Sequence, residues 1–184
     1  MALIQTSRGL GIPKESDQKA VGINPLTDRA AVAALLTEAQ DYYRLWLGRA
    51  PGPEQVEAVF TAGPPGCYPA KSHRLGLYLR DPNSGEAHTD LSGVAELSFG
   101  FPQPNDAYFG LMVLAPYARS QGHGAAFLAH IESLTLPHPH LNLAVLEANS
   151  RGMAFWRAHG FTVTGITRHD EETGHTNHRL VKYL

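Results

Sequence analysis

The stretch that decides the fold is residues 108–124, which read Tyr-Phe-Gly-Leu-Met-Val-Leu-Ala-Pro-Tyr-Ala-Arg-Ser-Gln-Gly-His-Gly. It opens with an apolar run that Pro116 closes, which predicts a β-strand over residues 108–115. Residues 125–132 are amphipathic and predict the start of a helix. Between the two, Gly122 and Gly124 allow a tight turn. The stretch therefore predicts a strand, a glycine turn and a helix in direct succession.

A glycine turn at the start of a helix is suited to binding a diphosphate. The first N–H groups of a helix lack intrahelical partners, and the helix dipole favours an anion there. Glycines let the backbone approach the phosphates closely, and Arg119 can add a charge-assisted contact. The alternative interpretation is an ordinary strand-to-helix turn of an α/β protein.

The spacing of the turn excludes two common phosphate motifs. The dinucleotide fingerprint G-x-G-x-x-G is not kept after Gly122, and the triphosphate loop needs a Lys that does not follow Gly124. What remains is R-x-x-G-x-G, from Arg119 to Gly124, after a strand that ends in proline. This pattern resembles the acetyl-CoA pyrophosphate loop of the GNAT-type N-acetyltransferases.

A second segment, residues 141–161, strengthens the resemblance. In that family a strand leads to an Asn, a short helix follows with Phe-Tyr, and Gly-Phe begins the next strand; the matching positions here are Asn149, Phe155-Trp156 and Gly160-Phe161. Asn149 is also a good helix N-cap, and Gly160 suits the end of a helix. The resemblance spans residues 24–184 and implies an α/β (α+β) fold, with a mixed, mostly antiparallel central sheet flanked by helices.

The resemblance also implies the cofactor-binding residues. In the family, the backbone of the strand before the loop pairs with the pantetheine amides, as an added strand would, and the loop holds the pyrophosphate. The strand positions are Met112, Val113 and Leu114, and the loop positions are Arg119, Ser120, Gln121, Gly122, His123 and Gly124. Asn149 matches the residue that reaches the pantetheine arm, although a plain N-cap role is the alternative. The expected co-substrate is acetyl-CoA, with no metal.

Glu96 is the candidate general base. Acetyl transfer to an amine needs a group, or a water chain, that accepts a proton. Glu96 interrupts the apolar run Val94-Ala95-Glu96-Leu97-Ser98-Phe99 and shares a strand face with Val94 and Ser98. A carboxylate in such a run is paired, exposed or functional, and an exposed face is the plainer alternative. Asp106 and Glu147 are lesser candidates.

The acid that protonates the CoA thiolate is not marked by the motif. Relatives carry a Tyr where this chain has Trp156, and an indole N–H cannot serve as a proton donor near neutral pH. Tyr117 is the substitute we predict, with Tyr108 and His159 as others. An exposed loop aromatic is the alternative for Tyr117, and a surface residue is the alternative for His159. Backbone donors or water could also assist the thiolate.

Composition sets broad limits on partners and compartment. The 184 residues have a formal net charge of −2 and a sequence pI near 6.5, which argues against nucleic acid or acidic membranes as partners. The single Cys67 excludes an intramolecular disulfide and fits a reducing cytoplasm. No apolar run approaches about 18 residues, and no signal-peptide pattern opens the chain. A homodimer is compatible with these limits.

The chain is expected to form one domain over residues 24–184, preceded by an irregular N-terminal arm over residues 1–23. Periodicity and turn residues predict the elements in order. They are a long helix over 24–47, a helix over 54–61, strands over 73–80 and 93–99 around a turn at 81–85, and a closing hairpin of 161–168 and 178–184 around 171–174.

The expected activity is transfer of an acetyl group from acetyl-CoA to a primary amine by direct attack within a ternary complex. A non-catalytic acyl-CoA-binding or sensing protein on the same fold is the alternative, and the missing helix Tyr favours it. The ten histidines have no recognised metal-ligand spacing. The acceptor stays open between a small amine, an amino acid and a protein N-terminus.

Overall fold

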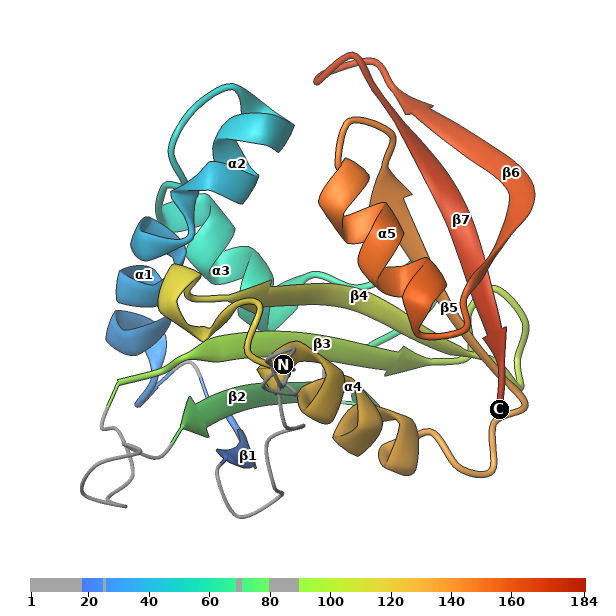
Figure 1. Cartoon of the computed structure of the whole chain (residues 1–184), viewed down its shortest axis with the longest axis horizontal. Helices are drawn as coiled ribbons and strands as arrows, with labels where there is room; N and C mark the ends of the chain where they lie inside the picture. Colours follow the sequence, from blue (N-terminus) through green and yellow to red (C-terminus); the bar gives the residue numbers. More distant parts are fainter. Residues whose placement is uncertain (1–17, 25, 69–70, 80–89) are drawn as a thin grey trace, which may run out of the picture.

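The computed structural model describes residues 18–24, 26–68, 71–79 and 90–184, in which seven strands form one sheet (Figure 1). Its strand order is β1-β2-β3-β4-β5-β7-β6. The strands are β1 (Gln18–Gly22), β2 (His73–Leu79), β3 (Gly93–Phe99), β4 (Ala107–Leu114), β5 (His140–Leu146), β6 (Thr162–Asp170) and β7 (His175–Tyr183). The helices are α1 (Arg29–Glu38), α2 (Gln40–Leu47), α3 (Pro53–Thr61), α4 (His123–Leu134) and α5 (Ser150–Ala158), with a short 3-10 turn, η3 (Pro116–Ala118).

One parallel pair interrupts the otherwise antiparallel sheet. β4 and β5 run parallel and pair only from Ala107 to Phe109 against Leu141 to Leu143. β4 continues to Leu114 and β5 to Leu146 without further pairing, so the two strands separate halfway along. Beyond Phe109, the β5 side of β4 therefore has no strand partner, and the sheet opens at this point.

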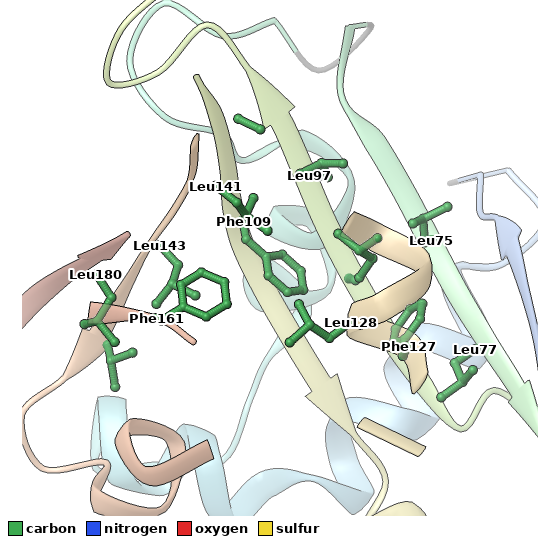
Figure 2. Close-up of a cluster of buried hydrophobic side chains, with 14 of the residues drawn as sticks. Leu75, Leu77, Leu97, Phe109, Phe127, Leu128, Leu141, Leu143, Phe161 and Leu180 are labelled. Carbon is green, nitrogen blue, oxygen red and sulfur yellow. The ribbon is translucent and has the colours of Figure 1, made fainter. Parts of the chain in front are cut away.

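Two apolar cores cover the two faces of the sheet. On one face, Phe127 and Leu128 of α4 pack on Leu75, Leu77 and Leu97 of β2 and β3 (Figure 2). On the other face, α1, α2 and α3 cover a second cluster that includes Leu35, Tyr43, Val59 and Val94. Successive strand residues point to opposite faces, so Ala95 and Leu97 of β3 face α4 while Val94 faces the second cluster. The predicted mixed sheet flanked by helices is confirmed.

The predicted single helix over 24–47 is wrong, because it is broken at Ala39. Ala39 ends α1 with φ −88° and ψ 23°, and α2 begins at the next residue. Both sides of the break keep their buried residues, since Leu35, Ala39 and Tyr43 all lie in the second core. The apolar spacing that predicts one helix is therefore satisfied by two shorter helices with a change of direction between them.

The irregular N-terminal arm predicted over residues 1–23 includes a β-strand. Residues 18–22 form β1, which pairs antiparallel with β2, and Ala20 packs against the first core. The strand is short and carries little hydrophobic alternation, so main-chain pairing with β2 rather than sequence pattern places it. Residues 1–17 and the turn predicted at 81–85 lie outside the described residues. The strand predictions at 73–79 and 93–99 and the closing hairpin are confirmed. In the described part of the chain, no helix is long and apolar enough to cross a membrane.

Candidate functional site

A cleft of about 670 Å³ opens where β4 and β5 separate. Its walls come from the diverging ends of both strands, the loop after η3, the start of α5 and the first turn of α2. The predicted strand residues Met112, Val113 and Leu114 all line it, together with Phe109 and Gly110. The unpaired edge of β4 therefore forms one wall of the cleft.

The glycine loop closes one end of the cleft. Ser120 and Gly122 have positive φ angles of 61° and 87°, and Gly122 is the residue from which α4 begins. A Cβ added to Gly124 would lie 3.3 Å from Leu114 and 3.4 Å from Phe155, so the loop packs closely against both sides of the cleft. Of the six predicted loop residues, four line the cleft: Arg119, Ser120, Gly122 and Gly124.

Gln121 and His123 do not line the cleft. The Gln121 amide instead donates to the Tyr117 carbonyl, which holds the loop in place. His123 is the first residue of α4. Its main-chain N–H belongs to the first turn of that helix, where N–H groups have no intrahelical acceptor.

Arg119 is already paired in this structure. Its guanidinium makes a two-fold contact with the Asp41 carboxylate of α2, with Nη2 donating to Oδ1 at 2.9 Å, and its Nε donates to the Leu114 carbonyl at 2.9 Å. The hydrogen bond from Arg119 holds the pKa of Asp41 below its usual value. The prediction that Arg119 contacts the pyrophosphate stays a prediction, and Asp41 would compete with the phosphate for its guanidinium.

Asp41→Asn should lower the free energy of unfolding by about 0–1 kcal/mol near pH 6, because the Asp41 carboxylate of this ion pair is largely exposed. A lowered folded pKa means that the contribution is present above the unfolded value of about 4 and is lost as the pH falls through the folded value. Urea denaturation of both proteins at pH 6 and pH 3 measures the difference. A difference that grows at pH 3 would contradict this assignment.

Arg151 is a cleft residue that sequence reasoning missed. Its guanidinium donates to the Ser120 hydroxyl at 2.9 Å and lines the cleft beside the loop. The available signal was its position two residues after Asn149, in the first turn of α5. Arg151 brings a positive charge to the loop that no carboxylate of the described residues neutralises.

Asn149 is confirmed as a helix cap and also lines the cleft. Its Oδ1 accepts a hydrogen bond from the Gly152 N–H at 2.9 Å. A Cβ on Gly152 would lie 2.5 Å from the Asn149 Nδ2, so a larger residue here would displace the capping side chain. Capping therefore orients this side chain on the wall of the cleft.

Trp156 packs in an aromatic cluster beside the cleft. Its ring makes edge contacts with Phe109, Phe155 and Phe161, at centroid distances of 5.3, 5.0 and 5.2 Å. Trp156 also lines the cleft, close to the point where β4 and β5 separate. Trp156 therefore packs against core residues and also forms part of the cleft wall.

Glu96 is buried and ion-paired rather than exposed. It is 4% exposed, and its Oε1 lies 2.6 Å from Nη1 of Arg74 and accepts a hydrogen bond from Ser98. Arg74 also donates to the Phe60 and Ala62 carbonyls at the end of α3. Glu96 lies directly against Gly110, where any side chain would collide with its Oε2. Gly110 lines the cleft although Glu96 itself does not.

Tyr117 lies away from the cleft. It is 45% exposed, its hydroxyl shares a 3.0 Å hydrogen bond with Ser92, and it is not among the residues that line the cleft. This placement speaks against Tyr117 as the thiolate acid, because η3 turns its ring towards β3 rather than β5. His159 does line the cleft, but it stacks on Phe155, the ring that flanks Gly124, and so lies at the loop end. Tyr108 does not line the cleft.

The two lesser carboxylate candidates and His138 have structural partners. Asp106 is buried and bonded to His140 at 2.8 Å, and Glu147 lies on an exposed turn near His178. His138 stacks on Phe99. Within the described residues, no group of three or more His, Cys, Asp or Glu side chains is arranged to hold a metal ion.

Comparison with solved structures shows which fold this is. An acetyltransferase from Thermus thermophilus superposes with a TM-score of 0.70 at 17% identity, over 91% of this chain and 97% of the other. The fold is that of the GNAT acetyltransferases. A GCN5-related N-acetyltransferase from Kribbella flavida superposes with a TM-score of 0.60 at 18% identity, over 91% and 98% of the two chains.

The GNAT fold extends to a neighbour whose acceptor is a protein. The ribosomal-protein-S18-alanine N-acetyltransferase from Escherichia coli superposes with a TM-score of 0.62 at 14% identity, over 90% of this chain and 93% of that one. No protein-family model and no curated protein matches the sequence. The likeness is therefore one of fold, and the chemistry must be argued from the cleft.

Proposed function

We propose that this protein is an acetyl-CoA-dependent N-acetyltransferase that transfers the acetyl group to a primary amine by direct attack within a ternary complex. The observation that carries the proposal is the cleft between β4 and β5, which ends at the glycine loop and the N-terminus of α4. An unpaired strand edge leading to an anion-binding helix start suits an amide-containing arm that ends in a diphosphate.

The pantetheine arm would lie along the open edge of β4. The main-chain groups of Met112, Val113 and Leu114 would pair with its amides as a neighbouring strand does. Asn149, held by its cap on the opposite wall, would reach the arm from α5. This arrangement would put the thioester near Gly110, where the strands separate.

The pyrophosphate would bind at the loop. Gly122 and Gly124 would let the backbone come close, and the first N–H groups of α4 would donate to the anion. Arg151 supplies a positive charge through its contact with Ser120. Arg119 would contribute its own charge when the phosphate displaces Asp41.

The proton released by the amine would pass to Glu96. The amine nitrogen attacks the thioester carbonyl, the C–S bond breaks, and the nitrogen gives up a proton. Glu96 is ion-paired with Arg74 and lies behind Gly110, close to the proposed thioester end of the cleft. A bridging water would carry the proton across the gap, since Glu96 does not itself line the cleft.

The departing thiolate would be protonated by solvent or stabilised by backbone N–H groups. Trp156 occupies the helix position beside the thioester and cannot supply a proton.

The alternative is a non-catalytic acyl-CoA-binding or sensing protein, which should bind acetyl-CoA but acetylate no amine. Acetyl-CoA consumption measured over a panel of amines separates the two, because binding without turnover on any amine favours a sensor.

Trp156→Phe should retain most of the turnover, because it removes an indole N–H and some packing but no proton donor. The cluster with Phe109 and Phe161 should lose about 1–3 kcal/mol of stability. Steady-state kinetics and urea denaturation test both statements, with Tyr117→Phe and His159→Gln compared under the same conditions. Loss of turnover by about a hundredfold in a folded protein that still binds acetyl-CoA would show that Trp156 acts in catalysis.

A further inference from the structure

Two arginines lie on the face of the sheet away from α4, each opposite a residue that lines the cleft. Asn177 and Ala144 line the cleft, and their cross-strand partners are Arg168 of β6 and Arg179 of β7. Residues directly opposite one another on neighbouring strands project to the same face. Both guanidinium groups therefore start from positions next to the cleft wall, on the face away from α4.

An aromatic pair holds Arg179 in position. Its guanidinium lies 5.2 Å from the centre of the Phe101 ring, and Phe101 makes an edge contact with Tyr108 at 5.1 Å. Tyr108 pairs in register with Ser98 of β3, two residues beyond Glu96 on the same face. The arginine, the two rings and the candidate base thus belong to one side of the sheet.

The positive charge of this face is not neutralised by the described residues. Neither Arg168 nor Arg179 forms an ion pair there, and the nearby carboxylates are engaged: Glu96 by Arg74, and Asp170 by the N–H groups of its own turn. Burial raises the pKa of Tyr108; the charge of Arg179 opposes this rise, that of Glu96 adds to it, and that of Arg168 opposes it.

The Asn142 side chain, next to Tyr108 in the sheet register, has a hydrogen-bond donor without an acceptor among the described residues. Asn142 is the register partner of Tyr108 on β4 and of Val181 on β7, and it is 4% exposed. Its Nδ2 is buried without a hydrogen-bond acceptor among the described residues. The unpaired Asn142 donor and the two arginines without ion pairs favour a ligand that brings acceptor oxygens.

We propose that the acceptor is a small amine that carries a carboxylate, as an amino acid does, and that Arg179, assisted by Arg168, binds that carboxylate. This rests on the proposed acetyltransferase function and names its substrate class. The planar guanidinium matches a carboxylate with two parallel hydrogen bonds, and stacking on Phe101 pre-orders it for that contact. The amine of the same molecule would then be held on the side of Glu96 and Gly110.

Paired acceptors that differ only in the carboxylate test the proposal. We would compare phenylalanine with phenethylamine and with phenylalaninamide, as kcat/KM at fixed acetyl-CoA. The expected result is a preference of about tenfold or more for phenylalanine over both of its carboxylate-free analogues. Turnover that prefers phenethylamine would overturn the inference while leaving the acetyltransferase function intact.

Substitutions that remove or reverse the charge of Arg179 provide a second test of the proposal. Arg179→Gln should lower the ratio of kcat/KM for phenylalanine to that for phenethylamine by about 10–100-fold, mainly through KM, and Arg179→Glu should lower it further. Arg157→Gln, on an exposed part of α5 outside the cleft, is the matched control and should leave the ratio unchanged. A ratio that is unaffected in folded Arg179→Glu contradicts the inference. No turnover on any amine by the unmodified protein contradicts the proposed function, and the inference with it.

Discussion

Replacing Gly124 with aspartate should abolish CoA binding while leaving the protein folded. A Cβ at this position would lie 3.3 Å from Leu114 and 3.4 Å from Phe155, so we expect a longer side chain to turn towards the cleft that Gly124 lines. Its carboxylate would then face the proposed pyrophosphate at the start of α4. A negative group in the first turn of a helix is favourable for the helix itself, which is why the fold should survive.

Calorimetric titration with CoA measures the effect, and circular dichroism verifies the fold. Gly124→Asn is the matched control, because asparagine has nearly the same size as aspartate and no charge. We expect weakened binding in the asparagine variant and undetectable binding in the aspartate variant, so the difference between them reports the charge. Unchanged affinity in Gly124→Asp would mean that the loop is not the cofactor site.

Glu96→Gln should lower turnover by about 10²–10⁴-fold, with little change in acetyl-CoA affinity. Glutamine keeps the size of the side chain and can still accept the hydrogen bond from Ser98, but it cannot take a proton at neutral pH. The measurement is kcat at saturating acetyl-CoA and amine. A drop below about threefold, far under the usual range for a general base, would remove Glu96 from the mechanism.

A structural effect must be separated from the catalytic one, because Glu96 is half of a buried ion pair. Breaking such a pair costs about 3–5 kcal/mol when one charge is left behind. Arg74→Gln breaks the same pair and keeps the carboxylate, so it is the matched control. If Glu96 is the base, Arg74→Gln should be destabilised to a similar extent in urea yet lose much less turnover than Glu96→Gln.

The parts of the candidate site that can be predicted from the sequence are those whose conformation depends on residues nearby in the chain. Gly122 is needed where the loop turns into α4, and Asn149 caps the helix that begins at the next residue. Each depends on neighbours within a few positions, so motif and propensity are sufficient. The same holds for strands β2 and β3, whose bounds follow from runs of apolar residues closed by turn residues.

The charge pairs could not be predicted in the same way. Arg119 meets Asp41 from a helix 78 positions earlier, and Glu96 meets Arg74 on the neighbouring strand. Both contacts depend on how the elements are arranged in space, and the sequence offers several other carboxylates and arginines as partners. Tyr117 shows the same limit, because whether its ring faces the cleft depends on the direction in which η3 turns.

The contact between Arg119 and Asp41 also couples the loop thermodynamically to α2, which lies far away in the sequence. An anion that takes Arg119 from Asp41 must at the same time detach the loop from α2, whose residues Tyr42 and Leu45 form part of the cleft wall. By linkage, the free energy by which the contact with Asp41 weakens anion binding equals the free energy by which a bound anion weakens the contact between the loop and α2. Occupancy of the loop by an anion would thus change how firmly α2 is held in the wall of the cleft.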